Sequence, residues 1–122
     1  MVRALKSQRI SLNLKENAKS SLMDVIERVK QEVSKVAPEN EVVLFGSRAR
    51  GAHRAESDWD FLILLDQEEL TKGEKEHLIN LLYDLELDIG EAISTIIHTK
   101  QEWEDMSVTP LYSIIKEEGI RA

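Results

Sequence analysis

Two acidic residues separated by one position, Asp58 and Asp60, are the residues of this sequence best placed to do chemistry. They stand at the start of an apolar run, Trp59 to Leu65, that predicts a strand. Because side chains alternate across a strand, both carboxylates project from one face, with Cα atoms roughly 7 Å apart. Two carboxylates held this close repel each other, and a divalent cation removes the repulsion. Hard oxygen ligands of this kind suit Mg²⁺, although Asp58 alone is better explained as a solvated capping residue at the start of the strand.

A second candidate site precedes the acidic pair, at the exit of another predicted strand, Glu41 to Phe45. Gly46 and Ser47 follow this strand directly and are expected to open a helix. The unpaired N–H groups of a helix N-terminus bind phosphate, and a glycine lets the phosphate approach the backbone. Arg48 and Arg50 add positive charge next to the turn. A Gly-Ser turn by itself is more often only structural, so this interpretation depends on the acidic pair that follows.

The elements that must position these residues are predicted from apolar periodicity and capping signals. The expected order is helix, strand, turn, strand, helix, strand and helix, over the segments Leu22–Val36, Glu41–Phe45, Gly46–Gly51, Trp59–Leu65, Thr71–Gly90, Ala92–Ile97 and a last helix that begins at Thr109-Pro110. This order predicts an α/β (α+β) domain with a small mixed sheet packed with helices. Residues 19–122 are expected to form that domain. Residues 1–18, which are polar and basic, are expected to form an N-terminal arm, either as a short edge strand or as disordered chain.

Composition limits the classes of protein to which this chain can belong. With 122 residues it has room for one domain, and without cysteine it cannot be a disulfide scaffold, a zinc ribbon or a thiol enzyme. A net charge of −7 argues against bulk nucleic-acid binding. No apolar run reaches the length of about 18 residues that a membrane span needs, and the start of the chain has no secretory signal, so a cytoplasmic location is expected.

The charge is divided unevenly along the chain. Residues 1–54 carry 11 Lys and Arg against 6 Asp and Glu, whereas residues 55–122 carry 5 against 17. The boundary falls inside the candidate site, between its basic and its acidic residues. The surplus acid of the second half predicts a basic partner.

The paired motif resembles a known family. Gly46-Ser47-Arg48-Ala49-Arg50-Gly51 followed by Ser57-Asp58-Trp59-Asp60-Phe61 is similar to the GSxxxG…SDxDhh signature of the minimal nucleotidyltransferases (MNT), in the DNA polymerase β-like superfamily. The segment from residue 110 to 120 is similar to the closing helix of many small members. The resemblance implies a nucleotidyltransferase fold and Mg²⁺-dependent transfer of a nucleoside monophosphate from a triphosphate such as ATP to a hydroxyl group.

The resemblance also implies roles for individual residues. Gly46 and Ser47 would hold the β- and γ-phosphates, and Arg48 or Arg50 would neutralise charge that develops on them. Asp58 and Asp60 would be the catalytic, metal-binding carboxylates. Small members commonly act with a HEPN-domain toxin, as the MNT antitoxin of a toxin–antitoxin pair, and the acceptor would then be a hydroxyl of that partner, such as a tyrosine. The base preference and a homodimer both stay open.

One departure from the family pattern bears on catalysis. Family enzymes usually supply a third carboxylate from the next strand, where this chain has Ser94 or Thr95. Asp88 and Glu91 lie a few residues upstream, and either is a candidate replacement. The alternative is a catalytically degenerate domain that neutralises its partner by contact alone. A small-molecule enzyme of the aminoglycoside-modifying kind ranks lowest, because such enzymes usually carry an extra helical domain.

Overall fold

The computed structural model describes residues 22–122. The expected arm and the domain start at residue 19 lie outside the described residues. Along the described chain the elements are α2 (Leu22–Val36), β1 (Asn40–Phe45), α3 (Ser47–Arg50), β2 (Trp59–Leu65), α4 (Lys72–Ile89), β3 (Ile93–Thr99), α5 (Lys100–Asp105), α6 (Pro110–Glu118) and β4 (Ile120–Arg121). None of the helices in residues 22–122 combines the length and apolar character of a membrane span.

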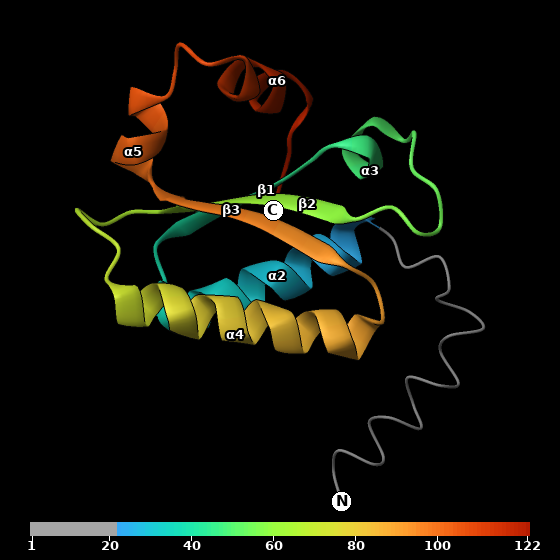
Figure 1. Cartoon of the computed structure of the whole chain (residues 1–122), viewed down its shortest axis with the longest axis horizontal. Helices are drawn as coiled ribbons and strands as arrows, with labels where there is room; N and C mark the ends of the chain where they lie inside the picture. The colour runs from blue at the N-terminus through green and yellow to red at the C-terminus, as the bar shows by residue number, and fades with distance from the viewer. Residues whose placement is uncertain (1–21) are drawn as a thin grey trace, which may run out of the picture.

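The four strands form one mixed sheet in the order β3-β2-β1-β4. Strand β1 is antiparallel to both β2 and β4, whereas β2 and β3 are parallel. Helices α2 and α4 cover one face of the sheet, and α5 and α6 lie over the other (Figure 1). The prediction of an α/β domain with a small mixed sheet is confirmed.

The larger part of the core lies between the sheet and the α2–α4 layer. The apolar stripe predicted for α2 supplies Val25, Ile26, Val29 and Val33, and α4 supplies Leu78, Leu82 and Leu85. Alternate residues of β2 face these helices, so Trp59 is 1% exposed and points into this core, as its position between the two aspartates predicts. Each fully buried large side chain stabilises the fold by about 1.5–3 kcal/mol.

The opposite face of the sheet carries a smaller core under α5 and α6. Its members are Val43, Leu62, Leu64, Trp103 and Ile115. Trp103, expected to be a packing anchor, is buried here. Because Asp60 is two residues before Leu62 on the same strand, its side chain leaves the sheet on this face. The face that carries the catalytic candidates is therefore the one on which α5 and α6 pack.

Helix ends agree closely with the capping signals. Thr71 and Glu74 form the predicted capping box, Gly90 ends α4 in the left-handed conformation, and Thr109 caps α6 with Pro110 in its first turn. Strand β4 was not expected, since two residues carry no periodic signal. It exists because Ile120 and Arg121 pair with β1, so this strand depends on a tertiary contact.

Candidate active site

The Gly-Ser turn and the acidic strand are brought together by the pairing of β1 with β2. Phe45, the last residue of β1, lies opposite Asp60. Gly46 then leaves the strand with a φ of 79° and caps the short helix α3. A Cβ atom at this glycine would overlap Asp60 Oδ2 and would lie 3.1 Å from its Cγ. A glycine is therefore required at position 46, both for the backbone conformation and for the close approach of Asp60.

The electrostatics of the site centre on Asp60. Burial raises the pKa of this carboxyl group, the negative charge of Asp58 raises it further, and the positive charge of Arg50 lowers it. Asp58 is exposed, immediately before β2, whereas Asp60 is partly buried. The positive charge of Arg50 does not fully offset the repulsion between the Asp58 and Asp60 carboxylates. Their oxygens therefore fit a hard divalent cation, which would remove this repulsion.

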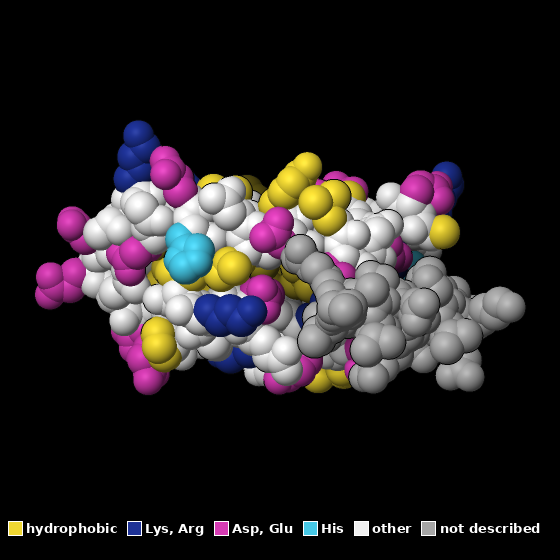
Figure 2. Space-filling model, turned by 90° about the horizontal axis from the view of Figure 1, so that it is seen from below, with side chains coloured by type: hydrophobic (Ala, Val, Ile, Leu, Met, Phe, Trp, Pro, Cys, Tyr) yellow, Lys and Arg dark blue, Asp and Glu magenta, His cyan; other side chains and the backbone are white. Residues whose placement is uncertain are grey.

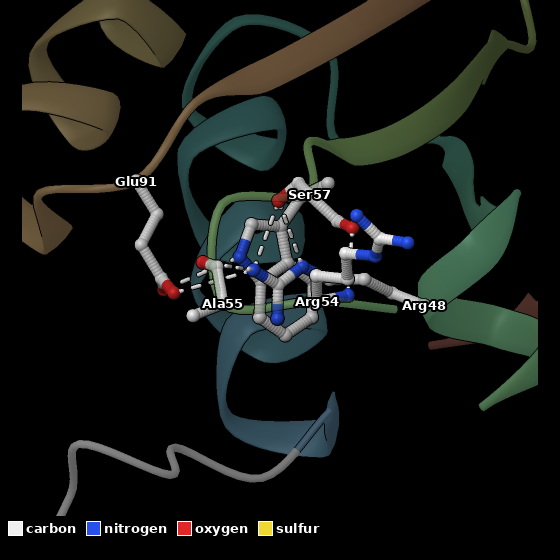
Figure 3. Close-up of polar contacts among 6 residues, drawn as sticks. Arg48, Arg54, Ala55, Ser57 and Glu91 are labelled. Carbon is white, nitrogen blue, oxygen red and sulfur yellow. Dashed lines mark hydrogen bonds and ion pairs between the residues drawn. The ribbon is translucent and has the colours of Figure 1, made fainter. Parts of the chain in front are cut away.

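Arg48 is placed differently from the nucleotide ligand that the sequence predicts. It is 5% exposed, and its guanidinium lies 4.2 Å from the ring centroid of Trp59. Figure 3 shows its guanidinium hydrogen bonds to the backbone carbonyls of Ser57, at 2.9 and 3.1 Å, and of Ala55, at 3.3 Å. Arg48 therefore fastens the loop that leads to Asp58.

Neither upstream acid supplies a third carboxylate to the site. Glu91 accepts a hydrogen bond from the indole Nε1 of Trp59 at 3.2 Å and pairs with Arg48 at 3.4 Å (Figure 3). Because Trp59 points to the α2–α4 face, these contacts hold Glu91 away from the face of Asp60. Asp88 forms an ion pair with Arg28 of α2. The contacts of Glu91 and Asp88 therefore argue against the hypothesis that one of them replaces the missing carboxylate ligand.

Ser94 occupies the place where the family usually has its third carboxylate. The parallel register sets it beside Asp60, and it is exposed on β3. Its neighbour Thr95 lies opposite Phe61 and so faces the other side of the sheet. Within residues 22–122, no group of three or more His, Cys, Asp or Glu side chains is gathered so as to hold a metal ion. Asp58 and Asp60 are accordingly the candidate protein ligands.

A third carboxylate does reach the turn, from the segment 110–120 that resembles the family's closing helix, although nothing in the sequence assigns this residue to the site. Glu118, the last residue of α6, accepts a hydrogen bond from the backbone N–H of Gly46 at 3.2 Å. It also pairs with Arg50, 68 positions away in the sequence, at 3.2 Å. No spacing rule relates residues so far apart, so the sequence carries no signal that Glu118 meets Gly46.

Comparison with known families identifies the domain. The sequence model of the family described as "Nucleotidyltransferase domain" matches residues 22–122, which is all of the described chain. The chain is a member of the nucleotidyltransferase domain family. The resemblance found in the Gly-Ser and Asp-x-Asp motifs is thereby confirmed, and the fold places both motifs of this nucleotidyltransferase domain at one end of β1 and β2.

Two relatives extend the comparison. The nucleotidyltransferase domain is 39% identical, over 83 residues, to a protein of Methanocaldococcus jannaschii named "Putative protein adenylyltransferase MJ0141"; the match covers 65% of this chain and 81% of that protein. It is also similar in fold to a chain of a structure titled "Crystal structure of the toxin-antitoxin with AMP-PNP". This likeness has a TM-score of 0.56 at 15% identity and covers 78% of this chain and 69% of the other. The second similarity concerns the fold alone.

Proposed function

We propose that this nucleotidyltransferase domain transfers AMP from ATP to a hydroxyl group of a protein. The observation that carries the proposal is the contact between the Gly46 turn and Asp60, since it joins a phosphate-binding backbone to a metal-binding carboxylate. The identity to a protein named as an adenylyltransferase supports ATP as the donor. The acceptor oxygen would bond to the α-phosphorus, the bond from that phosphorus to pyrophosphate would break, and the hydroxyl proton would pass to water.

The proposed roles follow the geometry. The N–H groups at the start of α3 and the hydroxyl of Ser47 would bind the β- and γ-phosphates, with Gly46 allowing close approach. Arg50, whose side chain is 52% exposed, would turn toward phosphate from its ion pair with Glu118. For Arg48 we propose a positioning role in place of the direct phosphate contact predicted from sequence, because it is buried in the loop before Asp58.

Asp58 and Asp60 are the residues that would hold Mg²⁺. When bound, the ion would supply charge neutralisation at the phosphates and a lower pKa for the acceptor hydroxyl. Two protein carboxylates together with substrate phosphates suffice for the usual magnesium site. The raised pKa of Asp60 agrees with this, since its cause is partly the neighbouring Asp58, a repulsion that a cation would relieve.

The proposed partner is a basic protein, and we infer a HEPN-type toxin neutralised by this domain as its antitoxin. The fold likeness to a toxin–antitoxin structure supports the partnership. Figure 2 shows the face formed by α2 and α4, where apolar and acidic side chains are mixed at the surface. On α4, Ile79, Tyr83 and Leu87 are 45%, 57% and 64% exposed at a spacing of four residues. This surface combines an apolar stripe with the surplus acid of the second half of the chain.

The test is transfer of label from ATP carrying ³²P on its α-phosphate. The full chain is incubated with Mg²⁺, the labelled ATP and the protein encoded next to it, and labelled protein is detected after electrophoresis. Asp58→Asn and Asp60→Asn should each abolish labelling, whereas Asp66→Asn, just beyond the far end of β2, should leave it unchanged. Labelling that persists in both site variants would contradict the proposal, as would binding of ATP without any transfer to a partner.

The second candidate function is that of a degenerate domain that neutralises its partner by contact. The specific observation in its favour is Ser94, an exposed hydroxyl beside Asp60 where a carboxylate is usual. Under this alternative the partner binds equally well to Asp58→Asn and Asp60→Asn and carries no label. A salt titration of that complex tests the charge argument, because an acidic surface and a basic partner should separate as ionic strength rises.

A further inference from the structure

The carboxylate of Glu118 contacts the turn at which the triphosphate is proposed to bind. Its Oε1 accepts the N–H of Gly46 at 3.2 Å, and Arg50 Nη1 donates to Oε1 and Oε2 at 3.3 and 3.2 Å. Carboxylate and phosphate oxygens use the same donors, namely backbone N–H groups at the start of a helix and guanidinium groups. Glu118 thus makes the contacts that an anionic ligand of this turn would make.

The end of α6 holds Glu118 at this position. Gly119 follows it, and a Cβ there would lie 2.5 Å from Val43 Cγ1 and 2.6 Å from the carbonyl oxygen of Ile115. Ile120 then pairs with Leu44 in the sheet. The backbone on the C-terminal side of Glu118 is fixed by its pairing with β1. The Glu118 carboxylate would therefore leave the turn by rotation of side-chain bonds, while the backbone stays in place. Its side chain is 18% exposed, so solvent is within reach.

Arg50 connects the Glu118 contact to the acidic pair. Its positive charge lowers the pKa of Asp60 while its guanidinium is hydrogen-bonded to Glu118. A triphosphate at the turn would bring more negative charge to the same place and would compete for both the Gly46 N–H and Arg50.

We propose that Glu118 competes with the nucleotide for the hydrogen-bond donors of the turn. In the free domain its carboxylate occupies the Gly46 N–H and the Arg50 guanidinium. When the triphosphate binds, the carboxylate is displaced and Arg50 binds the phosphates instead. This inference rests on the proposed function, since it assumes a triphosphate at the turn. The negative charge of Glu118 repels the nucleotide, since magnesium-bound ATP carries two net negative charges. At a separation of about 6 Å this repulsion lowers the affinity for the nucleotide roughly tenfold in water, and about threefold with salt screening.

The test is isothermal titration calorimetry of the full chain with Mg²⁺ and a non-hydrolysable ATP analogue. Glu118→Gln removes the charge and keeps an amide oxygen for the Gly46 N–H, so the analogue should bind about three- to tenfold more tightly. The matched control is Glu117→Gln, an exposed neighbour on α6 with the same change in charge. Affinity of Glu118→Gln that equals or falls below that of Glu117→Gln would overturn the inference.

A second measurement needs no variant. In the unmodified protein, the side-chain carboxyl ¹³C resonance of Glu118 should shift when the analogue saturates the domain, while that of Glu117 stays in place. A Glu118 resonance that does not move would also overturn the inference. Absence of analogue binding in all three proteins would overturn the proposed function together with the inference, whereas binding that Glu118→Gln does not strengthen overturns the inference alone.

Discussion

Gly46→Ala should damage the domain more than a change of glycine to alanine at any comparable turn. The backbone at this position has a φ of 79° and a ψ of −162°, a conformation essentially restricted to glycine that costs a residue with a Cβ about 1–3 kcal/mol. The new methyl group would also overlap Asp60 Oδ2 and would lie 3.1 Å from Cγ and 3.3 Å from Cβ of that residue. Because three Asp60 atoms are close, rotation of the carboxylate alone does not clear the overlap, and the two strands must shift.

Gly51→Ala is the matched control for this prediction. Gly51 ends the same short helix with a φ of 72°, and no atom lies within 4 Å of the position of its Cβ. Its ψ of 14° places it in the left-handed helical region, so it carries the smaller conformational cost of that region and no overlap. We expect Gly51→Ala to lower the free energy of unfolding by about 1–2 kcal/mol. Gly46→Ala should cost about 1–2 kcal/mol more, from a side chain forced off its rotamer and a displaced backbone.

The assay is thermal denaturation followed by circular dichroism, together with binding of magnesium and the ATP analogue. At this size each 1 kcal/mol corresponds to roughly 4–8 °C in Tm. The double variant Gly46→Ala with Asp60→Ala should be more stable than Gly46→Ala alone, since the overlap is removed while the conformational cost at position 46 stays. Equal stability of Gly46→Ala and Gly51→Ala, or no recovery in the double variant, would refute the reasoning that Asp60 packs against the Gly46 turn.

Three further predictions concern single side chains of the site. Because the pKa of Asp60 is raised in the folded state, this carboxyl group favours folding below its unfolded pKa, and that contribution is lost as pH rises through the folded pKa. Asp60→Asn should therefore stabilise the metal-free domain at pH 7, by less than about 1 kcal/mol because solvent screens the charge. Urea titrations should show this increase in the free energy of unfolding at pH 7 and none at pH 3. Arg48→Met should lower the free energy of unfolding by about 2 kcal/mol, because the partly buried carbonyl of Ser57 loses its two hydrogen bonds from the guanidinium. Arg54→Met, at an exposed position of the same loop, should change it little. Ser94→Asp should increase affinity for Mg²⁺ in a calorimetric titration, because the new carboxylate would stand beside Asp60; an equal increase in the neutral control Ser94→Asn would contradict this.

Most helices and strands could be predicted because their signals are local. The stripe on α2, the capping box of Thr71 and Glu74, and the strand that begins at Trp59 each depend on residues within one or two turns of each other. The alternation of Asp58, Trp59 and Asp60 likewise predicted which side chain enters the core. Strand β4 carried no such signal, because its two residues become a strand only by pairing with β1.

The site was predictable in part for the same reason. The Gly46–Ser47 turn and the acidic pair lie close together in the sequence, and their types and spacing were sufficient to place them at one candidate site. Arg48 has the residue type of a phosphate ligand, yet its orientation into the loop depends on Trp59 and on the carbonyls of Ala55 and Ser57. Sequence alone does not distinguish an arginine that fastens a loop from one that faces a ligand.

The sequence by itself thus determined the family, the order of elements as far as β3 and the pair of carboxylates, since short-range spacing and residue type carry that information. Only the tertiary structure decided which other charges surround the pair. It brought Glu118 to Gly46 and directed Glu91 to Trp59. The physical reason is that strand register and helix packing determine which distant side chains meet, and these depend on contacts across the whole sheet.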